Sequence, residues 1–98
     1  MTGKERLEAE EKRTRIYYRS GGRCEICEQP MPITTMQLGH RIGQTKPNLK
    51  KYGKEIIHHE LNMKATCSLK CNSKADISFR PEEVRSLVEE IRSAEGLT

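Results

Sequence analysis

The chain has 98 residues, of which 34% are hydrophobic, with no Trp and a single Phe. This leaves room for one domain with a thin core, a size at which small proteins need an additional staple. No apolar stretch approaches the roughly 20 residues of a membrane span, and no secretory signal is recognisable, so we expect a cytoplasmic protein without membrane association. The net charge is +4, but residues 40–74 alone carry eight Lys or Arg against two Glu. We therefore expect a polyanion to meet the middle of the chain.

The first predicted element is a helix from Lys4 to about Arg19. This stretch lacks Gly and Pro and is rich in Glu, Lys, Arg and Ala, and the sequence Ser-Gly-Gly at residues 20–22 ends it. Its apolar residues are few, so we expect its first turns to project into solvent or against a partner.

The middle of the chain predicts short elements. Residues 34–40 show the alternation of a strand, and residues 61–63 resemble a second one. Between them, residues 43–54 contain two glycines and a proline, which predicts a loop without regular structure. Residues 68–75 can form a short helix. The expected order is strand, loop, strand, helix.

A second long helix is predicted from Pro81, a residue favoured in a first turn, to a stop at Gly96. Its apolar residues follow helical spacing: Val84, Leu87, Val88, Ile91 and Ala94. Because a small core has too little area to cover both terminal helices, we expect a homodimer. The whole is expected to be a single domain, 1–98, with a helix at 1–20, a core at 24–77 and a helix at 81–95.

The four cysteines form two pairs. Cys24 and Cys27 are separated by two residues, and Cys67 and Cys71 by three. Each gap lets two thiolates reach one tetrahedral ion, so we expect a closed, structural Zn²⁺ site without an open position for substrate. Disulfides are disfavoured in a reducing compartment. A redox CxxC would be expected in a thioredoxin-like βαβ setting, which is not recognisable.

Three polar segments accompany the cysteines: Leu-Gly-His-Arg-Ile at residues 38–42, His-His-Glu-Leu-Asn at 58–62, and Cys-Asn-Ser-Lys at 71–74. With the cysteine pairs, in this order, they resemble the HNH endonuclease family over about residues 24–77. The resemblance implies an α+β fold with a small ββα-metal core, to which the terminal helices are additions. It also implies metal-dependent hydrolysis of phosphodiester bonds in DNA.

The resemblance assigns roles to three residues. His40 corresponds to the general base, Asn62 to the residue that orients its imidazole, and Asn72 to a ligand of a catalytic divalent cation. The chemistry of a histidine is compatible with its role, because an imidazole with a pKa near ~6.5 can accept a proton from water at neutral pH. A lone His is otherwise most often a surface residue, and Asn is common in turns and helix caps.

The chain departs from the family at Gly39, where many members carry an Asp or a His that binds the cation. Asn72 therefore lacks its usual partner, and we expect His59 to replace it, with His58, Glu60 or His40 itself as alternatives. Because an amide oxygen and an imidazole carry no negative charge, we expect weak binding of the catalytic ion and a preference for Mn²⁺ over Mg²⁺.

Basic side chains of the middle segment are expected to contact DNA phosphates: Arg41, Lys46, Lys50, Lys51, Lys54 and Lys74. The function predicted from the sequence is a DNA endonuclease of the HNH type. The main alternative is a non-catalytic zinc-binding module that grips nucleic acid, with a structural His40. A protein-interaction adaptor built on the flanking helices is a third reading, which the basic centre disfavours.

Overall fold

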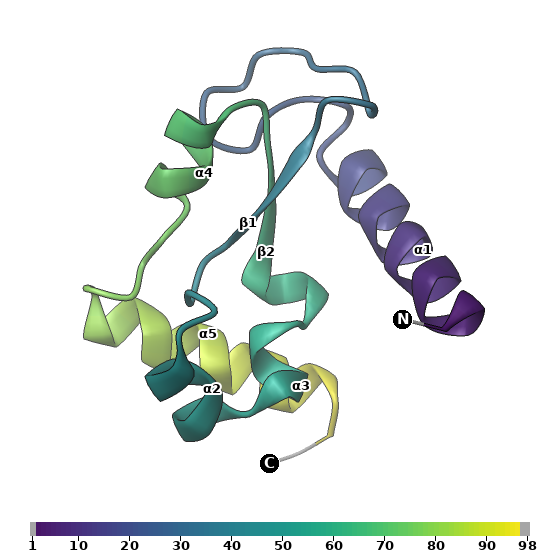
Figure 1. The fold of residues 1–98 in the computed structure, drawn as a ribbon. Coiled ribbons are helices and arrows are strands. Elements are labelled where there is room, and N and C mark those ends of the chain that lie inside the picture. The colour runs from purple at the N-terminus through teal and green to yellow at the C-terminus, as the bar shows by residue number, and fades with distance from the viewer. Residues whose placement is uncertain (1, 97–98) are drawn as a thin grey trace.

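An antiparallel pair of strands lies at the centre of the computed structural model, which describes residues 2–96 (Figure 1). β1 spans Gln37–His40 and β2 spans Met63–Thr66, and the register pairs His40 with Met63. The helices are α1 (Gly3–Arg19), α2 (Lys46–Tyr52), α3 (Lys54–Ile57), the 3-10 helix η1 (Glu60–Asn62), α4 (Leu69–Lys74) and α5 (Pro81–Ala94). In Figure 1, α1 and α4 lie on opposite sides of the strand pair, and α5 lies with α2 and α3 at one end. None of the described helices has the length and apolar content required to cross a membrane.

The two terminal helices agree with the sequence prediction. α1 begins at a cap, because the Thr2 hydroxyl accepts a hydrogen bond from the Glu5 backbone N–H. It ends before Gly21 and Gly22, which both have positive φ values. Ile16 is its one buried residue, so most of the helix surface faces solvent.

The connection between the strands corrects the sequence prediction, since residues 43–54 were expected to be a loop and instead contain helical turns. The Thr45 side chain caps α2 by accepting a hydrogen bond from the Asn48 backbone N–H. Pro47 fits the first turn, where no backbone N–H is needed. Gly53, with a φ of 88°, separates α2 from α3. Pro47 and Gly53 are typical of loops, but in this segment they begin and end a helix.

The strands are shorter than expected, and the second is shifted along the chain. The predicted strand at 34–40 begins only at Gln37. Residues 61–63, predicted as a strand, lie mostly in η1, and β2 starts at Met63. The predicted short helix is confirmed as α4, where the Ser68 hydroxyl accepts from the Cys71 backbone N–H.

Two hydrophobic clusters share the interior. The first joins α5 to α3 and to the segments that follow β1 and α4: Ile42, Ile56, Ile57, Ile77, Val84, Leu87, Val88 and Ile91. The second lies between α1, the strands and the cysteines: Ile16, Cys24, Met31, Met36, Met63, Ala65 and Cys71. α5 thus buries its apolar stripe within the chain. The stripe of this helix therefore no longer supports the expected homodimer.

α4 packs against β1 at Gly39, and this contact requires a glycine. A Cβ atom there would lie 3.1 Å from the Ala75 Cβ and 3.2 Å from the Asn72 Oδ1. Gly39 does not have a positive φ, so the constraint is the close approach of the helix and not the backbone conformation.

We expect Gly39→Ala to destabilise the protein by about 1–3 kcal/mol, because the buried Ala75 leaves the new methyl no space. Ala75→Gly should recover part of this loss in the double variant. Chemical denaturation of the two single variants and the double variant measures the coupling. Additive effects would show that α4 does not press on Gly39.

Candidate functional site

The side chains of Cys24, Cys27, Cys67 and Cys71 converge, and their sulfur atoms all lie within 4.8 Å of one another. The Sγ of Cys67 is 3.6 Å from that of Cys27 and 3.8 Å from that of Cys71. Metal–sulfur bonds of ~2.3 Å in a tetrahedron place the sulfurs roughly 3.8 Å apart. The four thiols therefore fit a metal ion such as zinc. Among residues 2–96, no other group of His, Cys, Asp and Glu is placed to do so.

The cysteines come from three different parts of the chain. Cys24 and Cys27 lie in the turn after α1, where Glu28 adopts a φ of 66° and donates its backbone N–H to the Cys24 carbonyl. Cys67 follows β2 directly, and Cys71 lies in the first turn of α4. A bound ion would tie the segment that precedes the strands to the segment that follows them.

The thiols have unequal acidity. Burial alone would raise the pKa of Cys24, but backbone N–H groups of Cys27, Ile26 and Cys67 hydrogen-bond its sulfur and lower the pKa to about 6. The hydrogen bond with Cys27 raises the pKa of Cys67 to about 12. The Cys24 thiolate thus forms readily, and the positive charge of a bound metal ion would favour the thiolate of Cys67.

His40 is the last residue of β1 and is half-buried. Its ring packs edge-on against that of His58, with 5.7 Å between centroids. Its Nε2 atom is buried without a hydrogen-bond partner, whereas its Nδ1 atom lies 3.4 Å from Nε2 of the exposed Gln44. Burial, and then the charges of His58 and Lys12, lower the pKa of His40 below its ordinary value. The ring is therefore neutral at pH 7, and Nδ1 is the nitrogen that can exchange a proton.

Lys12 and Gln44 are neighbours of His40 that no sequence pattern indicates. The Lys12 ammonium donates a hydrogen bond of 2.7 Å to the His58 carbonyl, across a separation of 46 residues that no local pattern encodes. Gln44 lies in the segment that was read only as a loop.

Asn62 does not orient the imidazole of His40 directly, which corrects the expected role. Its side chain is fully buried and faces the backbone: Nδ2 donates to the carbonyls of Ile42 and Ile57, and Oδ1 accepts from the Ile42 N–H. These bonds use both amide hydrogens. Asn62 is therefore a positioning residue that fixes the backbone after His40.

Asn72 and His40 are not brought to the same face of the strands. The Asn72 side chain lies against Gly39 and points its Nδ2 toward the Gln37 Oε1 and the Leu38 carbonyl, at 3.4 and 3.5 Å. Since neighbouring residues of a strand point to opposite faces, the His40 ring lies on the other face from Asn72. The Asn72 amide alone does not make a cation site.

His59, the expected second ligand, is engaged elsewhere. Its Nε2 lies 2.6 Å from a Glu95 carboxylate oxygen, and its Nδ1 accepts from the Leu61 backbone N–H at 3.1 Å. Both ring nitrogens are occupied. Of the alternatives, Glu60 pairs with Arg15, and this ion pair lowers the pKa of Glu60. The residues near Asn72 do not fit a catalytic divalent cation in this arrangement.

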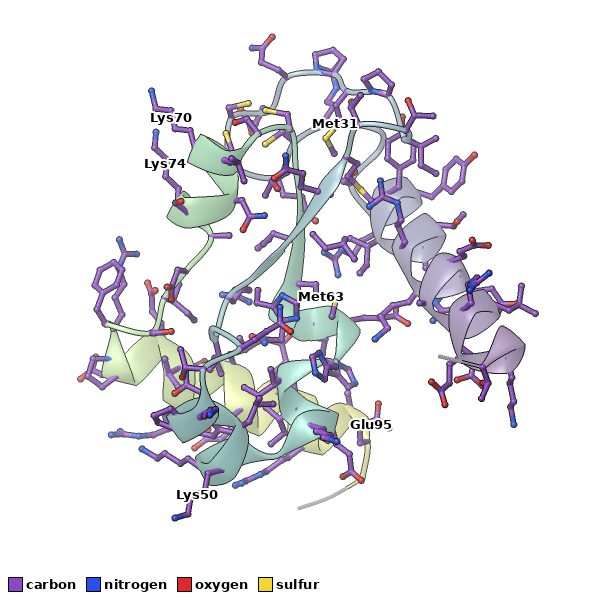
Figure 2. The ribbon with its side chains drawn as sticks, in the orientation of Figure 1. Met31, Lys50, Met63, Lys70, Lys74 and Glu95 are labelled. Carbon is purple, nitrogen blue, oxygen red and sulfur yellow. The ribbon has the colours of Figure 1, made fainter. Side chains whose placement is uncertain are left out.

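The basic side chains expected to meet DNA are divided between separate parts of the molecule. Lys46, Lys50 and Lys51 are exposed on α2, and Lys54 follows on α3. Lys74 projects from α4 beside Lys70, and Figure 2 places this pair far from Lys50. The half-buried Arg41 precedes both groups in sequence and directly follows His40.

The chain matched no protein-family model, no curated protein and no solved structure at a significant level.

We expect the cysteine cluster to control folding through a bound metal. Cys27→Ser removes the exposed ligand with little loss of packing, so its effect reports the metal. Structural zinc sites of zinc-finger peptides contribute about 10–16 kcal/mol, more than a small domain's total stability. The variant should lose bound zinc, as measured by elemental analysis, and lose the cooperative thermal transition.

The control is Ser73→Ala, which removes an exposed hydroxyl on α4 and leaves the cluster intact. A Cys27→Ser variant that melts like the control, or a wild-type protein purified without zinc and fully folded, would contradict a structural metal site.

Proposed function

We propose that the protein is a DNA endonuclease in which His40 is the general base. The observation that supports this most directly is the state of His40: a neutral imidazole at a strand end, with one nitrogen buried and the other beside an exposed side chain. The order of two antiparallel strands and a helix, with the cysteine cluster at the junction, agrees with the resemblance drawn from the sequence.

The proposed reaction uses Nδ1 of His40. This atom accepts a proton from a water molecule, and the water oxygen forms a bond to phosphorus while the bond from phosphorus to the 3′ oxygen breaks. The leaving 3′ oxygen takes a proton from solvent and becomes a 3′ hydroxyl, and the proton on His40 passes to solvent afterwards. Gln44 lies 3.4 Å from Nδ1, so its amide must turn away to admit the water. Nε2 is buried without a hydrogen-bond partner, which leaves Nδ1 as the nitrogen that a water molecule can reach.

In this proposal a catalytic divalent cation would bind mainly to the nucleic acid and not to a preformed site of the protein. The protein presents no preformed carboxylate site at Gly39, so the phosphate would have to supply most of the negative charge that holds the ion. A divalent ion would stabilise charge on the phosphoryl oxygens.

A specific observation favours a second candidate function, a zinc-binding module that binds nucleic acid without cutting it. His40 and Asn72 lie on opposite faces of the strands, and Gly39 offers no ligand. In that case the basic side chains of α2 and α4 bind phosphates and His40 is structural.

The two candidates differ in a plasmid assay. The wild-type protein should nick or linearise supercoiled DNA when Mn²⁺ or Mg²⁺ is added, with more activity in Mn²⁺, and His40→Ala should lower cleavage by about 10²-fold or more. Binding of the plasmid should be unchanged, because His40 contributes no exposed charge at neutral pH.

His59→Ala is the matched control, since the ring of His59 is hydrogen-bonded to Glu95 and to the Leu61 N–H and not to His40. Mobility shifts without cleavage in either ion would favour the binding module. Equal cleavage by His40→Ala and wild type would remove His40 from the mechanism.

The rate should depend on pH through His40. Only the neutral ring accepts a proton, so activity should fall as the pH drops through the His40 pKa, which lies below the usual 6.5. Lys12→Gln removes a positive charge that lowers this pKa, so the acid limb should move to higher pH. The control Lys4→Gln, on the exposed first turn of α1, should leave the limb in place. A limb that stays fixed in Lys12→Gln would count against His40 as the titrating group.

A further inference from the structure

An open groove of about 510 Å³ lies between α2 and α5, outside the cysteine cluster and the surroundings of His40. Its floor is apolar and belongs to the first hydrophobic cluster, with contributions from Ile42, Val84 and Val88. This volume falls within the range of about 300–1,000 Å³ that is typical of ligand pockets. In Figure 1, α2 and α5 lie at the same end of the molecule.

The rim of the groove is basic. Lys51 of α2 and Arg85 and Arg92 of α5 line it, and Glu89 is the one acidic residue among its lining side chains. All four side chains are exposed. An apolar floor beneath a cationic rim fits a ligand that has flat apolar parts and negative charges.

Both cation–π pairs found in the described part of the chain flank this groove. On α2, the Lys51 ammonium lies 5.3 Å from the centre of the Tyr52 ring, which lines the groove. The second pair is not part of the groove lining: the Arg80 guanidinium lies 5.1 Å from the centre of the Phe79 ring. Phe79 and Arg80 stand in the chain between Ser78 and Pro81, which both line the groove.

Phe79 has no structural role that explains its position. It is the single Phe of the chain and is 71% exposed, although it directly follows a segment that packs inside the fold. Arg80 is shared between this ring and the carboxylate of Glu83, at 3.3 Å. An exposed aromatic ring beside a basic rim is suited to stack on a base of nucleic acid.

We propose that this groove binds a single-stranded segment of DNA, with unpaired bases against Phe79 and Tyr52 and phosphates at Lys51, Arg85 and Arg92. In a duplex the bases are paired and stacked on one another, so their faces are unavailable to the rings. The proposal rests on the proposed function where it names the substrate: DNA with unpaired nucleotides next to the cleaved bond.

The groove is connected to His40 through the backbone. The Ile77 N–H donates to the Arg41 carbonyl at 2.7 Å, and the Gly43 N–H donates to the Ser78 hydroxyl at 3.2 Å. The segment that carries Phe79 is thereby fastened to the residues that directly follow His40. A strand held in the groove would continue toward the end of β1.

The test measures binding by the zinc-loaded full chain without added Mn²⁺ or Mg²⁺. Fluorescence anisotropy compares a labelled oligothymidylate with a blunt duplex of equal length. Phe79→Ala should weaken binding of the single strand by about 5- to 100-fold, the range for loss of one stacked base, and leave the duplex unchanged. Arg85→Gln should lower the slope of log affinity against log salt by about 0.7 for the single strand.

Two controls lie on α1, away from the groove: Tyr18→Ala, which removes an equally exposed ring, and Lys4→Gln, which removes an exposed charge. Phe79→Trp provides a direct probe, because the chain contains no Trp. The oligothymidylate should quench its fluorescence, and an acidic peptide such as polyglutamate should not.

Tighter binding of the duplex than of the single strand would overturn the proposal, as would Phe79→Ala and Arg85→Gln variants that bind like the controls. Quenching by polyglutamate at the same concentrations would identify a peptide site instead. The assay involves no cleavage, so its outcome is separate from that of the plasmid assay. Single-strand binding without cleavage in any metal would leave the groove in place and remove the nuclease.

Discussion

Convergence of four sulfur atoms is the constraint on which the rest of this fold depends. The segment from α1 to β1 contains no helix or regular strand, and its backbone hydrogen bonds are irregular: the Cys24 N–H donates to the Gln29 carbonyl, and the Glu25 N–H donates to the Ala65 carbonyl of β2. The same segment contributes Cys24, Met31 and Met36 to the second hydrophobic cluster. A metal ion at the sulfurs would fasten it to β2 and α4 at once, which supplies order that so small an apolar cluster does not supply alone.

The pairing of β1 with β2 then places Asn72 and His40 on opposite faces of the strands. α4 lies so close to β1 that only a glycine fits at position 39, and this close approach brings the Asn72 amide against the strand. The alternation of a strand sends His40 to the opposite face, toward α1, where burial and then the charges of His58 and Lys12 lower its pKa. The residue type at Gly39 is thus coupled to helix packing. A carboxylate at this position would require α4 to shift away from β1.

Sequence patterns predicted the elements whose signals are local. Helical spacing located α5, composition and the lack of Gly and Pro located α1, and the short gaps within the cysteine pairs predicted their convergence. The prediction of a loop at residues 43–54 was wrong because Pro and Gly occur both in loops and at helix ends. Here Pro47 lies in the first turn of α2, and Gly53 follows its last residue. The site was the least predictable part. Lys12 contacts His58 across a separation of 46 positions, and His59 contacts Glu95 across 36 positions. Both contacts depend on packing that no local pattern specifies.

Asn62 shows why a polar residue can occupy the centre of a thin core. Its amide satisfies three backbone groups of Ile42 and Ile57, both of which belong to the first hydrophobic cluster. A hydrophobic side chain of similar size would leave these buried groups unpaired, at a cost of about 1–3 kcal/mol each. The same bonds hold the backbone that leads from His40 to Ile42, and Ile42 forms part of the floor of the groove. One buried amide therefore connects the core to the end of β1 and to the groove between α2 and α5.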